Sequence, residues 1–254
     1  MLEAIVWGLV QGLTEFLPVS SSGHLRVVPD LLGLEPPDLA TSAVLHLGTL
    51  VALLAFYRRD IRWMVGGMRH DPRARSLGLL VVTATIPAVV AGSVLADRVE
   101  RFQDSSTAVG TALLATGAIL LASRFLTERN RNAEDLSTLD SLGLGVAQAL
   151  ALLPGISRAG VVITAGLARG LSGTQAARFG FLMAIPVTLG AGARETLTVT
   201  GAGAHLPELV AGTLVAAASG YWAISLLIRA LERHGIWPFS IYCFLVGATA
   251  LTWL

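Results

Sequence analysis

Six long apolar stretches constrain what this chain can fold into. A helix needs about 20 apolar residues to cross a hydrocarbon core of about 30 Å, and each stretch approaches or reaches that length. Hydrophobic residues make up 54% of the chain and charged residues 14%, whereas soluble domains carry about 25% charged residues. The sequence therefore predicts an all-α polytopic membrane protein with six transmembrane helices. The six stretches comprise residues 39–56, 77–96, 107–126, 179–199, 207–228 and 236–254.

The charged residues between these stretches predict an orientation in the membrane. All 18 basic side chains are arginines, and six of them lie in the segment 57–75. Short loops rich in arginine stay on the cytoplasmic side, so we expect this segment inside, together with the segments 127–140 and 229–235. The segment 97–104 has two arginines and three acidic residues, and we expect it outside with both chain ends.

Two further apolar segments are shorter, and each runs into a proline. Residues 2–17 lead into "PVSSSGH" and residues 142–153 lead into "PGISRAG". Neither segment is long enough to span a bilayer comfortably, and the proline ends any helix that precedes it. Irregular backbone at membrane depth is tolerated only where protein or a water-filled cavity surrounds it. We therefore expect two re-entrant helix–loop–helix hairpins.

The two hairpin segments resemble each other, which predicts an internal repeat. When their prolines are aligned, "PVSS" meets "PGIS", and Gln11 and Gln148 fall one residue apart. Three apolar stretches follow each hairpin, so one membrane domain (1–254) divides into halves of about 1–127 and 128–254. One hairpin and three spans give an odd number of crossings, so we expect inverted topology with a site where the tips meet. The alternative is that the two Leu-Pro breaks coincide by chance.

The tip of the first hairpin is crowded with polar side chains. Gln11 and Glu15 are four residues apart, so on a helix they share one face, and Pro18 ends that helix. Ionisable side chains inside a membrane are costly and point to function, which makes Glu15 and His24 candidates. The structural alternatives are an interfacial carboxylate for Glu15, a buried and hydrogen-bonded imidazole for His24, and helix capping for the serines. The tip serines are Ser20, Ser21 and Ser22.

The tip of the second hairpin supplies a cation. Gly155 permits a tight backbone turn, and Ser157 and Arg158 follow it between two apolar runs. A guanidinium group offers five fixed donors that suit phosphate oxygens, and backbone N–H groups at a hairpin tip also favour anions. Alternatively, Arg158 pairs with Glu15 for a purely structural reason.

Together the two tips suit a site that cuts or carries a phosphorylated lipid. A diphosphate beside a carboxylate needs a divalent cation between them, with Glu15 and Gln11 as the ligand pair. We expect the lipid tail to lie against the apolar segments 49–56 or 184–193. The small residues of these segments can equally serve helix packing.

At these residues the chain resembles the undecaprenyl-pyrophosphate phosphatase family of the bacitracin-resistance type. The first motif of that family has the form (E/Q)GxxEFLPVSSxGH, and residues 11–24 read "QGLTEFLPVSSSGH". The second family motif is PGxSRSGAT, and residues 154–162 read "PGISRAGVV". The first motif is highly specific, and the resemblance extends over the whole chain.

The resemblance implies an integral membrane phosphatase that removes the terminal phosphate of undecaprenyl diphosphate. The product is the monophosphate carrier lipid used for peptidoglycan and other envelope polymers. Such a protein lies in the bacterial inner membrane, opens its site to the periplasmic side, and works with Mg2+ or Ca2+. The implied partners are the polyprenyl diphosphate, the bilayer and a second copy of the chain, with no nucleic acid.

The resemblance also assigns roles to residues. We expect Ser21 to attack the terminal phosphorus or to orient a water that does, and His24 to transfer the proton. A serine, a histidine and a metal-bound water all remain open as the nucleophile. The catalytic residues are Glu15, Ser21, His24 and Arg158; the substrate-binding residues are Gln11, Ser20, Ser22 and Ser157; the metal ligands are Glu15 and Gln11.

The second motif departs from the family pattern at two positions. Ala159 stands where the family has its second serine, and Val162 stands where it has threonine. Two hydroxyl groups that could contact phosphate are therefore absent, although Thr164 lies two residues further on. The departure bears on phosphate affinity or on the identity of the substrate.

Three other functions compete with the phosphatase. Inverted repeats with central hairpins are also a transporter design, so a lipid flippase is one alternative. A homologue that only binds lipid diphosphates is another, and Ala159 and Val162 are its support. The phosphatidic-acid-phosphatase type of membrane enzyme needs a lysine in its first motif, and this chain contains no lysine.

Overall fold

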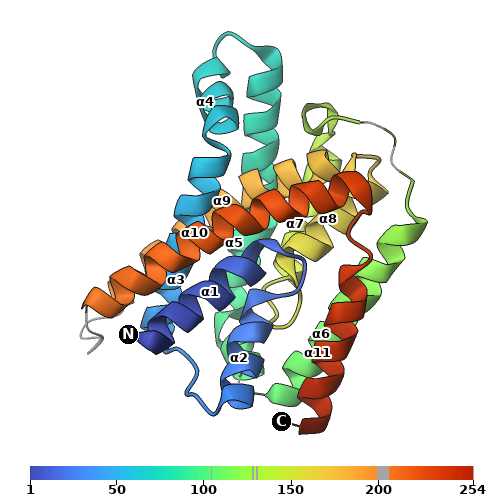
Figure 1. Ribbon diagram of the computed structural model, residues 1–254. Helices are drawn as coiled ribbons and strands as arrows, with labels where there is room; N and C mark the ends of the chain where they lie inside the picture. Colours follow the sequence, from blue (N-terminus) through green and yellow to red (C-terminus); the bar gives the residue numbers. More distant parts are fainter. Residues whose placement is uncertain (104, 128, 130, 199–205, 254) are drawn as a thin grey trace.

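The structure is a computed structural model that describes residues 1–103, 105–127, 129, 131–198 and 206–253. Within these residues the chain forms α-helices and two short 3-10 helices, with no β-strand beyond one isolated bridge between Arg131 and Leu171. The predicted all-α class is therefore confirmed (Figure 1). Residues 104, 128, 130, 199 and 254 of the expected loops and spans lie outside the described part.

The helices follow the order of the predicted segments. The first half contains α1 (Leu2–Phe16), α2 (Ser21–Leu32), α3 (Leu39–Phe56), α4 (Arg58–Gly67), α5 (Pro72–Gln103) and α6 (Ser106–Ala122). The second half contains α7 (Thr138–Leu150), α8 (Arg158–Ala168), α9 (Gly173–Thr198), α10 (Leu206–Arg233) and α11 (Phe239–Trp253). The 3-10 helix η1 (Ser123–Phe125) ends the first half, and η2 (Ala133–Asp135) begins the second.

Several helices are long and apolar enough to cross a membrane. Within the described residues these are Pro72–Leu95, Ser106–Phe125 and Leu206–Arg233. A fourth candidate consists of α3 and α4 together, which meet at an angle of 71°. The described part of the chain thus has three or four candidate spans by length and composition, and its helices are those of a multi-pass membrane protein.

Each hairpin is broken where the sequence places its proline and glycine. α1 ends at Phe16, because Leu17 is extended and Pro18 follows. Ser20 then takes the left-handed φ of 71° and caps α2. In the second hairpin, Gly155 adopts a φ of +92°, and Ser157 caps α8.

Each hairpin packs against a long helix of the other half. α1 lies against α10, and α7 lies against α5. Glycine permits both approaches: a Cβ on Gly8 would lie 2.3 Å from the carbonyl oxygen of Gly212. A Cβ on Gly145 would likewise lie 2.3 Å from the carbonyl oxygen of Ala84. Small residues at such crossings let helix backbones come close in a membrane protein.

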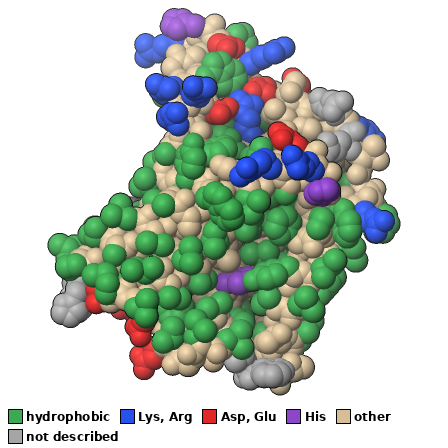
Figure 2. Space-filling model, viewed as in Figure 1, with side chains coloured by type: hydrophobic (Ala, Val, Ile, Leu, Met, Phe, Trp, Pro, Cys, Tyr) green, Lys and Arg blue, Asp and Glu red, His purple; other side chains and the backbone are tan. Residues whose placement is uncertain are grey.

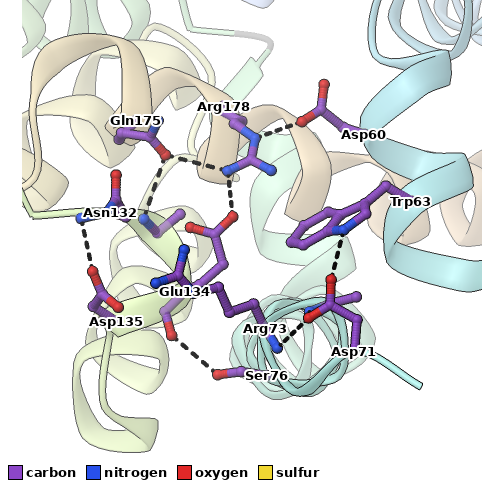
Figure 3. A network of polar contacts seen from close by, with 12 residues as sticks. Asp60, Trp63, Asp71, Arg73, Ser76, Asn132, Glu134, Asp135, Gln175 and Arg178 are labelled. Atoms are coloured by element: carbon purple, nitrogen blue, oxygen red, sulfur yellow. Dashed lines mark hydrogen bonds and ion pairs between the residues drawn. The ribbon is translucent and has the colours of Figure 1, made fainter. Parts of the chain in front are cut away.

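A polar network joins the halves at the end of the molecule that carries α4 (Figure 3). Arg178 of α9 donates to Asp60 of α4 at 2.6 Å and to Glu134 of η2 at 2.7 Å. Trp63 of α4 donates to Asp71 at 2.9 Å. Figure 2 shows basic side chains gathered at this end, while hydrophobic side chains cover most of the rest of the visible face.

Candidate active site

Glu15 lies at the centre of the polar cluster between the hairpin tips. It occupies the last turn of α1, and only 11% of its side chain is exposed. Its Oε2 accepts hydrogen bonds from Gln11 Nε2 at 3.0 Å and from Ser21 Oγ at 2.6 Å. The predicted pairing of Gln11 with Glu15 on one helix face is confirmed, and the hydroxyl of Ser21 is aimed at a carboxylate.

Arg158 brings the second hairpin to this carboxylate. It begins α8, and its Nη1 lies 3.8 Å from Glu15 Oε1. The same nitrogen donates to the hydroxyl of Thr188 in α9 at 3.2 Å. The guanidinium group is therefore paired with Glu15, as the structural alternative expected, and Arg158 also lines the polar cavity described below.

The two tips touch each other directly. Ser22 Oγ of the first hairpin accepts a hydrogen bond from the Gly155 N–H of the second at 3.4 Å. Thr116 of α6 braces the second tip, because its hydroxyl donates to the Gly155 carbonyl at 2.8 Å and accepts from the Ser157 N–H at 3.0 Å. Residues more than a hundred positions apart in sequence thus share one small volume.

Ser20 caps the second helix of its hairpin, as the structural alternative for the first-tip serines expected, and Ser157 caps the second helix of the other hairpin. Ser20 Oγ accepts from the Gly23 N–H at 3.3 Å, and Ser157 Oγ accepts from the Gly160 N–H at 3.1 Å. Capping uses one lone pair of each hydroxyl oxygen and leaves its proton free to turn elsewhere. Both serines line the cavity described below, so capping and substrate contact are compatible.

His24 stands apart from the carboxylate. Its ring is buried, with Nδ1 2.7 Å from the Ser20 carbonyl oxygen and Nε2 2.8 Å from the Tyr242 hydroxyl of α11. A carbonyl oxygen can only accept, so Nδ1 carries the proton and Nε2 accepts from Tyr242. This is the buried, hydrogen-bonded histidine of the structural alternative. Its role in proton transfer stays a prediction.

Three contributors escaped the sequence analysis. His46 of α3 places its Nε2 3.7 Å from Glu15 Oε2, while its Nδ1 donates to the Ser42 carbonyl at 2.8 Å. The other two are Thr188, which holds Arg158, and Tyr242, which holds His24. A histidine inside an apolar stretch is the one signal that could have found His46.

Two cavities meet at this cluster. A polar cavity of about 120 Å³ is lined by four serines, Thr14, His46, Glu15 and Arg158 together with three apolar residues of the second tip. A narrow apolar cavity of about 20 Å³ lies between α1, α3, α8 and α9. Among the described residues, only Glu15 and Arg158 line both cavities. A ligand with a polar head and an apolar chain can therefore place their junction at this pair.

The donor set near Glu15 fits a hard divalent cation. The described residues contain no group of three or more His, Cys, Asp or Glu side chains that could hold a metal by themselves. However, Gln11 Oε1 is buried and lacks a partner within the described residues, while Nε2 of the same amide donates to the Glu15 carboxylate. Mg2+ is commonly held by one or two carboxylates plus substrate phosphates. Glu15 and Gln11 thus suit a cation that a diphosphate helps to bind.

The two departures in the second motif face the apolar cavity. Ala159 and Val162 are buried and line that cavity, and neither lines the polar one. Thr164 lines neither cavity, and its Oγ1 is buried without a partner in the described part of the chain. Thr164 therefore does not replace the absent hydroxyl groups at the site.

Residues 4–249 match the family model described as bacitracin resistance protein BacA. Relatives named undecaprenyl-diphosphatase cover nearly the whole chain. One from Alcanivorax borkumensis is 43% identical over 260 residues, which are 99% of this chain and 98% of the relative. One from Thermomicrobium roseum is 40% identical over 267 residues (98% and 96%). One from Geobacter sulfurreducens is 36% identical over 264 residues (100% and 98%).

Proposed function

The chain belongs to the bacitracin resistance protein BacA family, and from that premise we propose that it is an integral membrane phosphatase. Its reaction is the hydrolysis of undecaprenyl diphosphate to undecaprenyl phosphate and inorganic phosphate. This activity returns the carrier lipid to the monophosphate form used in cell-envelope synthesis. Its close relatives carry the name of the same activity.

One observation carries the proposal: the polar and apolar cavities share Glu15 and Arg158. A prenyl diphosphate has a charged head joined to an apolar chain, and the two cavities offer a compartment for each. Arg158 and the backbone N–H groups at the tips supply positive charge for the head. A carrier would need that recognition too, but it would not need a hydroxyl group held 2.6 Å from a carboxylate.

The chemistry follows from the contact between Ser21 and Glu15. Ser21 Oγ attacks the terminal phosphorus while its proton passes to Glu15 Oε2, which already accepts its hydrogen bond. The bond between that phosphorus and the bridging oxygen breaks, and undecaprenyl phosphate leaves with the electron pair. Water then cleaves the phosphoserine and releases phosphate. Glu15 is better placed than His24 for this proton, because both nitrogens of His24 are engaged elsewhere.

Positioning and charge compensation supply the rest of the catalysis. Arg158 holds the diphosphate near Ser21, and Thr188 fixes the guanidinium group. A divalent cation, Mg2+ or Ca2+, held by Glu15 and Gln11 would offset the negative charge of the head group. The polar cavity is also lined by Ser20, Ser22 and Ser157, whose hydroxyl groups can donate to phosphate oxygens.

We also propose that the fold consists of six transmembrane helices and two re-entrant hairpins in inverted repeats. The packing of each hairpin on the other half supports this arrangement. A shift of 137 residues superimposes four features: the packed glycines Gly8 and Gly145, the buried glutamines Gln11 and Gln148, the capping serines Ser20 and Ser157, and the glycines Gly23 and Gly160. This register is one residue away from the alignment on the prolines.

The protein is proposed to lie in the bacterial inner membrane with its site open to the periplasmic side. Ion pairs that link two segments expected inside support this orientation. Arg178 pairs with Asp60 of α4 and with Glu134 of η2. The arginine-rich segment 57–75 and the segment 127–140 therefore lie at one end of the molecule, as the positive-inside rule requires.

The proposal is tested by phosphate release from a C15 or C55 prenyl diphosphate by purified protein in detergent. The assay is run with Mg2+, with Ca2+ and with EDTA, beside Glu15→Ala, Arg158→Ala and His24→Ala. We expect metal-dependent release that is lost in the first two variants. Absence of release by the wild type under every condition would overturn the proposal and favour lipid binding or transport.

Two further measurements refine the test. Trapping a phosphoserine at position 21 distinguishes a serine nucleophile from a metal-bound water, and substantial activity in Ser21→Ala would reject the serine. Light scattering of the detergent-solubilised protein tests the homodimer that the family resemblance implies.

A further inference from the structure

We propose that Tyr242 and His24 are positioning residues that hold the peptide between Ser20 and Ser21 in the geometry that the reaction needs. In this assignment His24 does not transfer the proton of Ser21. The inference rests on the proposed phosphatase function and deepens it, because it names the residues that aim the Ser21 hydroxyl group.

The first tip contains a strained backbone position directly before Ser21. Ser20 has a φ of 71° and a ψ of 100°, and among the described residues it is the only one other than glycine with a positive φ. Residues with a side chain rarely adopt such a conformation and keep it only where surrounding contacts hold it. Strain of this kind beside a reactive hydroxyl group points to a function for the contacts that maintain it.

Two hydrogen bonds from His24 hold this position. Its backbone N–H and its Nδ1–H both donate to the Ser20 carbonyl oxygen, at 3.2 Å and 2.7 Å. That carbonyl belongs to the planar peptide unit that ends at the Cα of Ser21. Fixing the carbonyl therefore restricts the direction in which the Ser21 side chain leaves the backbone, and Ser21 Oγ reaches Glu15 Oε2 at 2.6 Å.

Tyr242 determines which nitrogen of His24 carries the proton. Its hydroxyl group lies 2.8 Å from Nε2 of the buried His24, and the two rings are nearly parallel, at 5° to each other. When the hydroxyl group donates to Nε2, the proton stays on Nδ1, which faces the Ser20 carbonyl. The opposite tautomer would place the Nδ1 lone pair against that carbonyl oxygen and would lose the bond that holds Ser20.

The helix that carries Tyr242 also reaches the tip with its next residue. Cys243 Sγ lies 3.6 Å from the Pro18 carbonyl oxygen, so α11 contacts the break of the first hairpin at two places. The second tip is held in a similar way, because Thr116 of α6 donates to the Gly155 carbonyl at 2.8 Å. α6 and α11 pack against each other, so each tip is braced by a hydroxyl group from the last α-helix of the other half.

The first test replaces His24 by two amides that differ in reach. Asparagine places an N–H near the position of Nδ1 and can donate to the Ser20 carbonyl, whereas glutamine places it near Nε2. Neither amide can take up a proton during the reaction. With farnesyl diphosphate in detergent, His24→Asn should keep kcat within about fivefold of the wild type, whereas His24→Ala and His24→Gln should lower it between about 10- and 100-fold. KM should change less than about threefold in all three variants, because Arg158 still binds the head group.

The outcomes of this test separate positioning from proton transfer. If His24 transfers a proton, His24→Asn will be as inactive as His24→Ala, and that result would overturn the inference. Rescue by glutamine and not by asparagine would also overturn it, because the position of Nε2 would then be the one that matters. Absence of phosphate release by the wild type would instead reject the proposed phosphatase function, and the spectroscopic measurement below would still decide the inference.

Tyr242→Phe tests the second contact with a smaller change. It should lower kcat about tenfold, the effect of losing one hydrogen bond, because His24 is then free to adopt either tautomer. In the His24→Asn background it should have no further effect, since asparagine is too short to meet the Tyr242 hydroxyl group. The matched control Tyr221→Phe changes a tyrosine of α10 that lines neither cavity and should keep the wild-type kcat. Equal effects of Tyr242→Phe in the two backgrounds would overturn the inference.

A spectroscopic measurement tests the tautomer without any assay of activity. Wild-type protein labelled with nitrogen-15 histidine in detergent should show a His24 signal with the proton on Nδ1, identified by its absence from His24→Asn. In Tyr242→Phe, the fraction of this ring that carries its proton on Nε2 should rise. A wild-type signal with the proton on Nε2, or on both nitrogens, would overturn the inference whether or not the protein hydrolyses prenyl diphosphates.

Discussion

The two hairpins share a backbone design but carry opposite chemistry. In the register of 137 residues, Ser21 corresponds to Arg158, and Glu15 corresponds to Leu152. The first tip thus carries a carboxylate and a hydroxyl where the second carries an apolar side chain and a cation. Two identical acidic tips facing each other would repel and would also repel a diphosphate. The comparison teaches that two similar helix–break–helix segments can provide similar geometry, while a few different side chains give them different chemical roles.

The largest effect is expected from removing the charge that only the first hairpin has. Glu15→Gln keeps the size of the side chain but cannot accept the Ser21 proton, so kcat should fall about 100-fold or more, the range of general-base catalysis. The matched variant Leu152→Gln places the same amide at the corresponding position of the second tip. Phosphate release from farnesyl diphosphate gives kcat for both variants. Activity above a tenth of wild type in Glu15→Gln would contradict the role of Glu15.

A second experiment asks whether the hairpins are packed alike. Gly8→Ala and Gly145→Ala each place a methyl group against a carbonyl oxygen, so each should lower the free energy of unfolding by roughly 1–3 kcal/mol. Gly66→Ala is the control, because a Cβ there meets nothing within 4 Å. It should be neutral or slightly stabilising, since alanine favours helix. Thermal unfolding in detergent measures the stability of all three variants. A loss of stability in only one of Gly8→Ala and Gly145→Ala would show that the two hairpins are not packed alike.

Local sequence rules predicted the parts of the site that depend on neighbours along the chain. The spacing of Gln11 and Glu15, the break at Pro18 and the capping serines all follow from one or two helical turns. His46, Thr188 and Tyr242 could not be found this way, because each comes from a different helix and reaches the site only through tertiary packing.

The position of His24 teaches a similar lesson. The motif correctly places it near the tip serines, but its hydrogen bond to the Ser20 carbonyl one turn back turns the ring towards α11. The proposed register of 137 residues differs by one residue from the alignment on the prolines for a related reason. The glycine contacts and helix caps that support it depend on packing that the sequence alone does not display.

The hairpins also differ in how their first helices are anchored. α7 begins with a capping box formed by Ser137 and Asp140, and Arg131 and Arg169 each lie 2.9 Å from the Asp140 carboxylate. Burial by itself would raise the pKa of Asp140, but the hydrogen bonds from Ser137, Arg131 and Arg169 lower it well below its usual range. The side chain of Met1, the N-cap residue of α1, makes no capping hydrogen bond.

This difference predicts a dependence on pH. Because the pKa of Asp140 is depressed in the folded protein, its stabilisation is complete above the ordinary value of about 3.9 and is lost as the pH falls below it. Asp140→Asn should lower the free energy of unfolding by about 1.5 kcal/mol at neutral pH. The variant should also lose less stability than the wild type as the pH is lowered. Unfolding midpoints between pH 7 and pH 3 check this, and parallel curves for the variant and wild type would refute it.

The smallest effect separates the two capping serines. Changing either serine to alanine removes its capping hydrogen bond and should lower the free energy of unfolding by about 1 kcal/mol. Ser20 alone has a left-handed φ, so Ser20→Gly should be more stable than Ser20→Ala by about 1 kcal/mol or slightly more. Ser157 has a φ of −78°, which alanine adopts easily. Ser157→Gly should therefore exceed Ser157→Ala in stability only by the smaller amount that glycine gains as a tolerated N-cap. Chemical denaturation of the four variants gives the comparison, and an equal gain at both sites would argue against strain at Ser20.

The close approach of Gly8 to Gly212 also fixes when the molecule can be completed during its synthesis. Roughly 190 residues separate the end of α1 from the start of α10. At about 5–20 residues per second, the first hairpin waits roughly 10–40 s for the helix that covers it. Arg158 is synthesised within that interval, and α1 can already pack against α2 and α3, but its main packing partner is missing until α10 arrives. The packing around the reactive centre is therefore completed only when the last quarter of the chain is inserted.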